Sequence, residues 1–345
     1  MSKLLVTGGA GFIGTNFVRY WAERHSDDLV VVLDKLTYAG KQENLDGLPL
    51  TFVHGDIGDT ELVRRLIREH ALDTIVHFAA ESHVDRSIAG PDAFVETNVL
   101  GTHSMLKAAR AEWLDSGSGL PHRFHHISTD EVYGSLDLED PGFTETTPYA
   151  PNSPYAASKA ASDHLVRAYN RTFGLETSIT ACSNNYGPYQ YPEKLIPLFL
   201  RNCLTGRNLP IYGDGMNVRD WLHVEDHCRG IELVLVRGRP GEAYNIGGGQ
   251  ELPNIALVDT LCTLVDALFA ADPDLARRFP DAPAAQGVPS ASLKTFVTDR
   301  LGHDRRYAID ETKARNEIGY AAERSFSEGL EATVKWYLDQ PAFTA

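Results

Sequence analysis

Two short segments combine side chains that can move protons. Tyr155 and Lys159 stand four residues apart in Tyr-Ala-Ala-Ser-Lys, so on a helix they share one face. A free tyrosine has a pKa of about 10 and is a poor base at neutral pH, but a nearby ammonium group favours its phenolate form. Such a phenolate can take a proton from a hydroxyl group while a hydride leaves the same carbon. The pair therefore predicts alcohol oxidation, with a surface tyrosine beside a solvated lysine as the alternative.

The second segment, Ser-Thr-Asp-Glu-Val-Tyr-Gly at 128–134, follows a hydrophobic strand-like run. Adjacent carboxylates on a regular strand point to opposite faces, so Asp130 and Glu131 can reach one substrate only if the strand has already turned. Tyr133-Gly134 favours such a turn. An elimination needs one proton removed and one donated, whereas a simple alcohol dehydrogenase or an epimerase needs no acid pair here. The pair indicates an elimination, with a solvated acidic turn as the alternative.

A glycine-rich loop supplies the candidate cofactor site. Gly8, Gly11 and Gly14 lie between a strand-like run and a helical pattern, where glycines let the backbone approach a pyrophosphate at a helix N-terminus. Asp34 follows Gly14 by 20 residues, at the end of the next strand, where a carboxylate accepts hydrogen bonds from ribose hydroxyls. It would repel a 2′-phosphate, so NAD is favoured over NADP. Asp56-Ile57 ends the third strand and could flank the adenine, or could be an ordinary strand end.

Strand-like and helical patterns alternate through the first half of the chain. Strands are expected at 4–6, 29–33, 51–53, 74–78, 124–127 and 177–182, with helices near 12–25, 61–70, 92–113 and 155–173. This alternation predicts an α/β fold with a Rossmann-type doubly wound parallel sheet. After Asn184 the chain is rich in Gly and Pro turns, so we expect a NAD-binding domain at 1–183 and mainly a substrate-binding lobe at 184–345, with some interleaving. The stretch 270–292 looks like a surface excursion.

Composition limits the partners. The 345 residues carry a formal net charge of −15, so nucleic acid is not an expected partner and a phosphate ligand must be held locally. The four cysteines are far apart and read as reduced, mostly buried thiols of a cytoplasmic protein. Their spacing supports no metal site. No signal peptide and no uninterrupted apolar stretch of membrane-spanning length are found, so no membrane partner is expected.

Several further motifs resemble those of the dTDP-glucose 4,6-dehydratase family, within the extended short-chain dehydrogenases/reductases. They are Thr-Gly-Gly-Ala-Gly-Phe-Ile-Gly at 7–14, Asp-Lys-Leu-Thr-Tyr-Ala-Gly at 34–40, Glu-Ser-His-Val-Asp-Arg-Ser at 81–87, the segment 128–134, Ser-Asn-Asn-Tyr-Gly-Pro at 183–188, Pro-Glu-Lys-Leu-Ile-Pro at 192–197, Gly-Asp-Gly at 213–215, Val-Arg-Asp-Trp at 218–221, and 299–304. The resemblance runs from residue 3 to about residue 310. Leu301 departs from it, because the family usually has Pro there, and this could alter a nucleotide-facing loop.

The resemblance implies a lyase that dehydrates dTDP-glucose and regenerates its NAD. Tyr155 would be the base for oxidation at C4, supported by Lys159, and Thr129 would bind O4. Glu131 would remove the C5 proton, and Asp130 would protonate the leaving C6 hydroxyl. The implied cofactor contacts are Gly8, Gly11, Phe12, Ile13, Gly14, Asp34, Lys35, Thr37, Asp56, Ile57, Thr97, Tyr155, Lys159 and Asn185. The implied substrate contacts are Ser82, Thr129, Asn184, Lys194, Leu195, Pro210, Tyr212, Arg219, Asn254, Asp299 and His303.

Other functions stay open at this stage. A sugar-nucleotide 4-epimerase shares the fold and the Tyr/Lys pair, but Asp130-Glu131 argues against it. A non-catalytic NAD-binding regulator could dispense with Tyr155 and Lys159, and both are present. Dehydratases of UDP-, CDP- or GDP-sugars also remain possible, because the sequence motifs do not identify the nucleotide base of the substrate. The resemblance further implies a homodimer formed through the helices near 92–113 and 155–173.

Overall fold

The computed structural model describes residues 1–119, 121–340 and 343. Its main sheet has seven strands in the order β10-β6-β5-β4-β1-β2-β3, and every pairing in it is parallel. This confirms the predicted Rossmann-type fold. The strand order reverses between β1 and β4, which opens a crevice beyond their carboxyl ends. The strands are β1 (Lys3–Thr7), β2 (Leu29–Asp34), β3 (Thr51–His54), β4 (Thr74–His77), β5 (Arg123–Thr129), β6 (Thr177–Cys182) and β10 (Ala243–Ile246).

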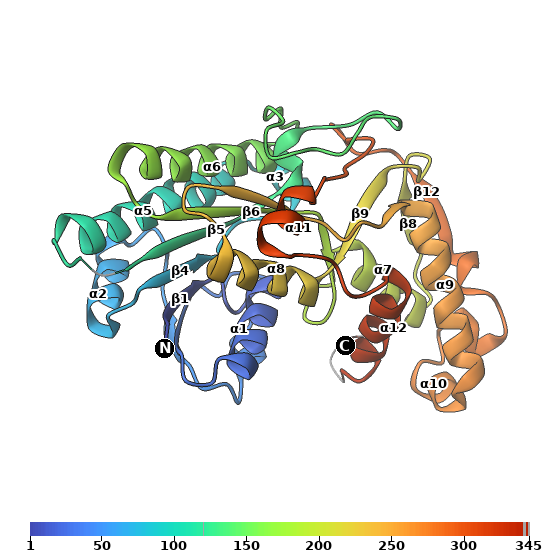
Figure 1. The fold of residues 1–345 in the computed structure, drawn as a ribbon. Helices are drawn as coiled ribbons and strands as arrows, with labels where there is room; N and C mark the ends of the chain where they lie inside the picture. The colour runs from blue at the N-terminus through green and yellow to red at the C-terminus, as the bar shows by residue number, and fades with distance from the viewer. Residues whose placement is uncertain (120, 341–342, 344–345) are drawn as a thin grey trace.

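Helices cover both faces of this sheet because its strands are apolar on both sides. Leu5 and Val31 pack against one layer of helices, whereas Leu4 and Val32 pack against the other. Figure 1 shows α5 and α6 above the sheet and α1 and α8 below it. The first layer contains α2 (Thr60–His70), α5 (Thr102–Arg110) and α6 (Pro154–Phe173), with α3 (Val84–Ala89) and α4 (Asp92–Phe94) at its edge. The second layer contains α1 (Phe12–Arg24) and α8 (Val224–Arg237).

A smaller lobe lies beside the sheet and has its own hydrophobic core, built largely from α7, α9 and α12. Its strands are β7 (Asn184–Tyr186), β9 (Val218–His223) and β11 (Glu251–Pro253) in one sheet, and β8 (Leu209–Tyr212) with β12 (Lys294–Val297) in another. Its helices are α7 (Leu195–Leu204), α9 (Asn254–Ala271), α10 (Pro273–Arg278) and α12 (Phe326–Leu338). α11 (Thr312–Ile318) instead packs near β10 and α8. Since α8 and β10 belong to the large sheet layer, the two lobes interleave along the chain.

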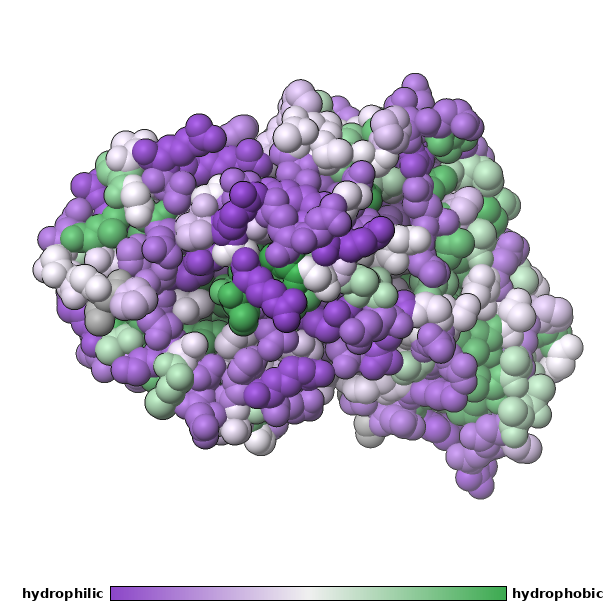
Figure 2. All heavy atoms as spheres, in the orientation of Figure 1, coloured by the Kyte–Doolittle hydropathy of each residue, from purple (hydrophilic) through white to green (hydrophobic). Residues whose placement is uncertain are grey.

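One sequence expectation about the small lobe needs correction. The stretch 270–292 is not a loose excursion, because it forms α10 and short turns whose Leu275 and Ala282 are buried in the core. Helix α9 is long and apolar enough to cross a membrane by length and composition alone, with a mean hydropathy of 1.6. Here it packs through Leu257, Leu261 and Val265 into the lobe core. The face in Figure 2 is mainly hydrophilic, and hydrophobic residues gather beside α9.

The turn between β1 and α1 packs tightly against the backbone around it. Gly8 has a φ of +69°, and a side chain on it would lie 2.7 Å from the backbone nitrogen of Ala79, which follows β4. A Cβ on Gly14 would lie 2.2 Å from the carbonyl oxygen of Gly8. The loop can therefore hold its shape at the crevice only with glycine at both positions.

Gly14→Ala should lower the free energy of unfolding by about 1–3 kcal/mol, because the new methyl group must push the backbone of the loop aside. Gly90→Ala is the matched control, since nothing lies within 4 Å of a Cβ at that position. Urea unfolding followed by circular dichroism measures both variants. Equal stability of the two would contradict the close approach of loop and helix.

Candidate active site

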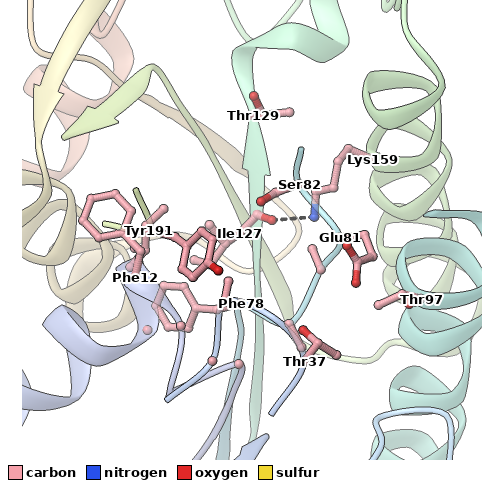
Figure 3. Close-up of a pocket in the computed structure, with 18 of the residues that line it drawn as sticks. Phe12, Thr37, Phe78, Glu81, Ser82, Thr97, Ile127, Thr129, Lys159 and Tyr191 are labelled. Atoms are coloured by element: carbon pink, nitrogen blue, oxygen red, sulfur yellow. Dashed lines mark hydrogen bonds between the residues drawn. The ribbon is translucent and has the colours of Figure 1, made fainter. Parts of the chain in front are cut away.

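A cleft of about 460 Å³ opens at the carboxyl ends of the central strands. The residues predicted for catalysis and for cofactor contact all line it, although they come from segments between Gly8 and Asn185. Of the predicted substrate contacts, Ser82, Thr129, Asn184 and Lys194 line it as well. Figure 3 shows Thr129 at the end of its strand, Lys159 reaching in from α6, and Phe12, Phe78 and Tyr191 on the opposite side.

Asp34 is held in the crevice by the backbone. One carboxylate oxygen accepts a hydrogen bond from the Ala10 N–H at 2.9 Å, and the other accepts one from the Leu36 N–H at 2.8 Å. Lys35 forms an ion pair with Asp56 at 2.7 Å, so its charge is already matched and gives a 2′-phosphate little attraction. Among the described residues no side chain caps the first turn of α1, which leaves its N–H groups for an anion. These residues fit a dinucleotide with a free ribose diol.

Tyr155 and Lys159 lie one turn apart on α6, which begins where the Ser153 hydroxyl accepts a hydrogen bond from the Ala156 N–H at 3.1 Å. The Lys159 ammonium donates a hydrogen bond to the carbonyl oxygen of Ile127 at 2.7 Å (Figure 3). Burial lowers the pKa of Lys159 to about 8, and the Asp163 carboxylate opposes that shift. Burial, assisted by the Glu131 carboxylate, raises the pKa of Tyr155 well above its usual value. Tyr155 therefore keeps its proton until a positive charge approaches.

The acid pair lies where β5 breaks. The strand ends at Thr129, and a 3-10 turn at Asp130–Tyr133 follows directly. The Thr129 hydroxyl accepts a hydrogen bond from the Glu131 N–H at 3.3 Å. This confirms the predicted turn, which brings both carboxyl groups to one cleft.

The two carboxyl groups differ in their electrostatic surroundings. Asp130 is 2% exposed, and its Oδ2 has no hydrogen-bond partner among the described residues. Burial, then the neighbouring carboxylates of Glu131 and Asp220, raises the pKa of Asp130 well above its usual range. Burial also raises the pKa of Glu131, but Lys194 and Arg219 oppose that shift. Such a pair suits a proton donor beside a proton acceptor.

Three cations face this acid pair in an otherwise acidic chain. Lys194 donates a hydrogen bond to the Ser82 carbonyl oxygen at 3.0 Å, and Arg219 is buried with its guanidinium 4.2 Å from the centre of the Tyr307 ring. Arg300 forms an ion pair with Asp85 at 2.7 Å. Each of the three lowers the pKa of Glu131, so their positive field reaches the cleft. A diphosphate group is a natural ligand for this arrangement.

The remaining predicted substrate contacts lie outside the cleft lining, on the small lobe. The parallel pairing of β8 with β12 places Pro210 beside Thr295 and Tyr212 beside Val297. His303 Nδ1 lies 2.7 Å from an Asp299 carboxylate oxygen, and its ring centre is 6.2 Å from that of Tyr212. Asn254 begins α9, and Leu195 begins α7. The structure thus brings together Tyr212, Asp299 and His303.

Sequence reasoning missed several residues that line the cleft. Glu81 follows the end of β4, a position that the strand pattern alone could have singled out. Tyr38 and Tyr191 meet edge to face with ring centres 5.6 Å apart, and the Arg86 guanidinium lies 3.6 Å from the Tyr38 ring centre. Arg86 also pairs with Glu193 at 3.1 Å. No local pattern indicates these contacts, because they join segments that are far apart in the sequence.

Comparisons with known proteins agree with the site. The model of the family described as GDP-mannose 4,6 dehydratase matches residues 5–333. A dTDP-glucose 4,6-dehydratase from Xanthomonas campestris pv. campestris (strain B100) is 53% identical over 344 residues, covering 98% of this chain and 93% of that protein. A solved dTDP-glucose 4,6-dehydratase from Streptomyces venezuelae with NAD bound is 52% identical, with a TM-score of 0.86 over 98% of this chain and 97% of its own. A UDP-glucose 4-epimerase from Thermotoga maritima with UDP-glucose is 28% identical, with a TM-score of 0.83 over 97% and 98% of the two chains.

The charge difference in the acid pair can be observed directly. At pH 7 the infrared spectrum should contain the C=O stretch of a protonated carboxyl group that Asp130→Asn removes, because the pKa of Asp130 is well above its usual range. Asp163→Asn is the matched control: its partners hold the pKa of this buried carboxyl below its usual range, so the variant should lose only a carboxylate band. Loss of a carboxylate band in Asp130→Asn would contradict the assignment.

Proposed function

The chain belongs to the dTDP-glucose 4,6-dehydratase family, and from this premise we propose that it is a hydro-lyase that converts dTDP-glucose to dTDP-4-keto-6-deoxyglucose. The observation that carries the proposal is the acid pair at the end of β5, with Asp130 buried and Glu131 open to the same cleft as Tyr155. A 4-epimerase of the same fold needs oxidation and reduction at C4 but no acid pair for an elimination. The likeness in fold to an epimerase therefore does not decide the reaction, whereas these two side chains do.

NAD is the cofactor that the crevice fits. The glycine loop at 8–14 would receive its pyrophosphate, and Asp34 would accept hydrogen bonds from the adenosine ribose. Lys35, Thr37, Asp56 and Thr97 line the same end of the cleft. When bound, NAD supplies the acceptor for the hydride of sugar C4, the source of the hydride for C6, and a positive charge that favours the Tyr155 phenolate.

The oxidation falls to Tyr155, Thr129 and Lys159. Tyr155 takes the proton of the C4 hydroxyl, and the Thr129 hydroxyl orients O4 beside it. The ammonium of Lys159 lies one helical turn away, where its charge favours the phenolate. Because Tyr155 and Lys159 are both almost fully buried, this charge is weakly screened.

The elimination falls to the acid pair. The 4-ketone makes the C5 proton acidic, and Glu131 removes it. Asp130 gives its proton to the C6 hydroxyl, which leaves as water. The surroundings of the pair suit these roles, because a general base works best with a pKa near the working pH and a general acid must hold its proton at that pH.

The substrate is anchored by its diphosphate and its nucleoside. Lys194 and Arg219 would pair with the diphosphate, and Ser82 and Asn184, which line the cleft, would contact the sugar. Tyr212, Asn254, Asp299 and His303 on the small lobe would hold the nucleoside. The dTDP preference is taken from the relatives, whose sequences match along nearly the whole chain.

We also propose a cytoplasmic homodimer. The segments near 92–113 and 155–173 are helical on one side of the sheet and carry exposed apolar side chains. Val95, Leu100 and Phe173 are 50%, 58% and 40% exposed. Such side chains favour burial against a second copy. The four cysteines are free thiols, which suits a reducing compartment.

Glu131→Gln tests the function. The variant keeps its size and hydrogen bonding but cannot accept the C5 proton, so turnover of dTDP-glucose should fall by about 10²–10⁴-fold. The oxidation should survive, so the absorbance of enzyme-bound reduced NAD should appear without 4-keto-6-deoxy product.

Tyr155→Phe is the control, because it blocks the first step and should give neither bound reduced NAD nor product. Near-normal turnover by Glu131→Gln would mean that the acid pair is only a structural turn. The dehydratase assignment would then be wrong, and an epimerase or dehydrogenase activity would be the remaining alternative.

A further inference from the structure

A buried polar cluster contacts the ammonium group of Lys159. It contains His126 on β5 and Asp163 on α6, and both side chains are 0% exposed. A buried carboxylate is unfavourable unless it is paired and hydrogen-bonded. The reaction steps described above do not use either residue, so the presence of this cluster needs an explanation.

One nitrogen atom connects the cluster to Lys159. His126 Nε2 lies 3.2 Å from the Lys159 ammonium nitrogen and 3.3 Å from an Asp163 carboxylate oxygen. Lys159 and Asp163 are also four residues apart on α6, so they share one helix face. This ring nitrogen can pair with only one of the two groups at a time: it accepts from the ammonium, or it donates to the carboxylate. In either case the negative charge of Asp163 acts on the ammonium through space and raises the pKa of Lys159.

Asp163 is fixed by donors on its other oxygen. Ser128 and Tyr149 each donate a hydroxyl hydrogen bond to Oδ2, at 2.7 Å and 2.9 Å. Arg167 donates in turn to the Tyr149 hydroxyl at 3.2 Å. The two donors to Oδ2 come from β5 and from the segment before α6, and they hold the carboxylate beside His126.

The other titratable groups that face the cluster are neutral near pH 7. On β4, burial lowers the pKa of His77, whose ring centre is 5.3 Å from that of His126; on β5, it lowers the pKa of His126 to about 4. Burial raises the pKa values of Cys182 on β6, Tyr155 on α6, Tyr133 and Tyr149. Lys159 and Asp163 are therefore the charged pair, with Arg167 at the outer end.

We propose that Asp163 is a positioning residue for the reaction: together with His126 it holds the Lys159 side chain in place and keeps its ammonium group charged beside Tyr155. This inference rests on the proposed function, since it gives Lys159 its task in the oxidation at C4. Without the Asp163 carboxylate, the buried ammonium has no negative partner within the cluster. It would then lose its proton at lower pH, and its support of the Tyr155 phenolate would end there.

The test is the pH profile of kcat for Asp163→Asn, measured with saturating NAD and dTDP-glucose. Activity that needs a charged Lys159 is lost as pH rises through the pKa of Lys159. Removing the Asp163 charge lowers that pKa, so the alkaline limb of the profile should move to lower pH by about one unit, a loss of roughly tenfold above it. His126→Asn removes the connecting nitrogen but no charged group, and it should move the limb in the same direction.

Tyr149→Phe is the matched control, because it removes one hydrogen bond to Asp163 and leaves the negative charge. Its profile should keep the wild-type limb. An unshifted limb in both Asp163→Asn and His126→Asn, or an equal loss of kcat at every pH, would overturn the inference while wild-type turnover leaves the proposed function intact. Absence of 4-keto-6-deoxy product from the wild type would instead contradict the proposed function.

Discussion

The meeting of parallel strand ends at one edge of the sheet is the constraint on which the rest of the site depends. Parallel strands are joined by crossover helices, which cover both faces of the sheet. A ligand therefore binds in the crevice beyond the carboxyl ends of the strands. There β1 delivers the glycine loop, β2 delivers Asp34, and β5 delivers Thr129 followed by the acid pair. The same arrangement buries Tyr155 and Lys159, and burial is the largest influence on the pKa of each.

The small lobe completes the site by supplying positive charge to an acidic chain. Lys194 precedes α7 and Arg219 lies on β9, so both are fixed by the lobe's own core. Their positive charges oppose the rise of the Glu131 pKa. For Asp130, burial and the carboxylates of Glu131 and Asp220 outweigh the opposing charge of Arg219. The lobe thus helps to give two adjacent carboxyl groups different pKa values, in addition to holding a ligand.

Much of this could be predicted from local patterns. The spacing of Gly8, Gly11, Gly14 and Asp34 follows directly from strand–turn–helix geometry, and the turn after Thr129 follows from Tyr133-Gly134. Contacts between distant segments could not be predicted in this way. The approach of His126 to Asp163, and the packing of 270–292 onto α9, depend on how separate elements meet, which a periodic pattern does not encode.

We infer that oxidation, elimination and reduction occur in one cleft without exchange of the transferred hydrogen. dTDP-glucose carrying deuterium at C4, mixed with unlabelled substrate and followed by mass spectrometry and NMR, tests this most directly. The deuterium should appear at C6 of the same sugar that lost it from C4. Deuterium lost to water, or found in the products of unlabelled substrate, would contradict it.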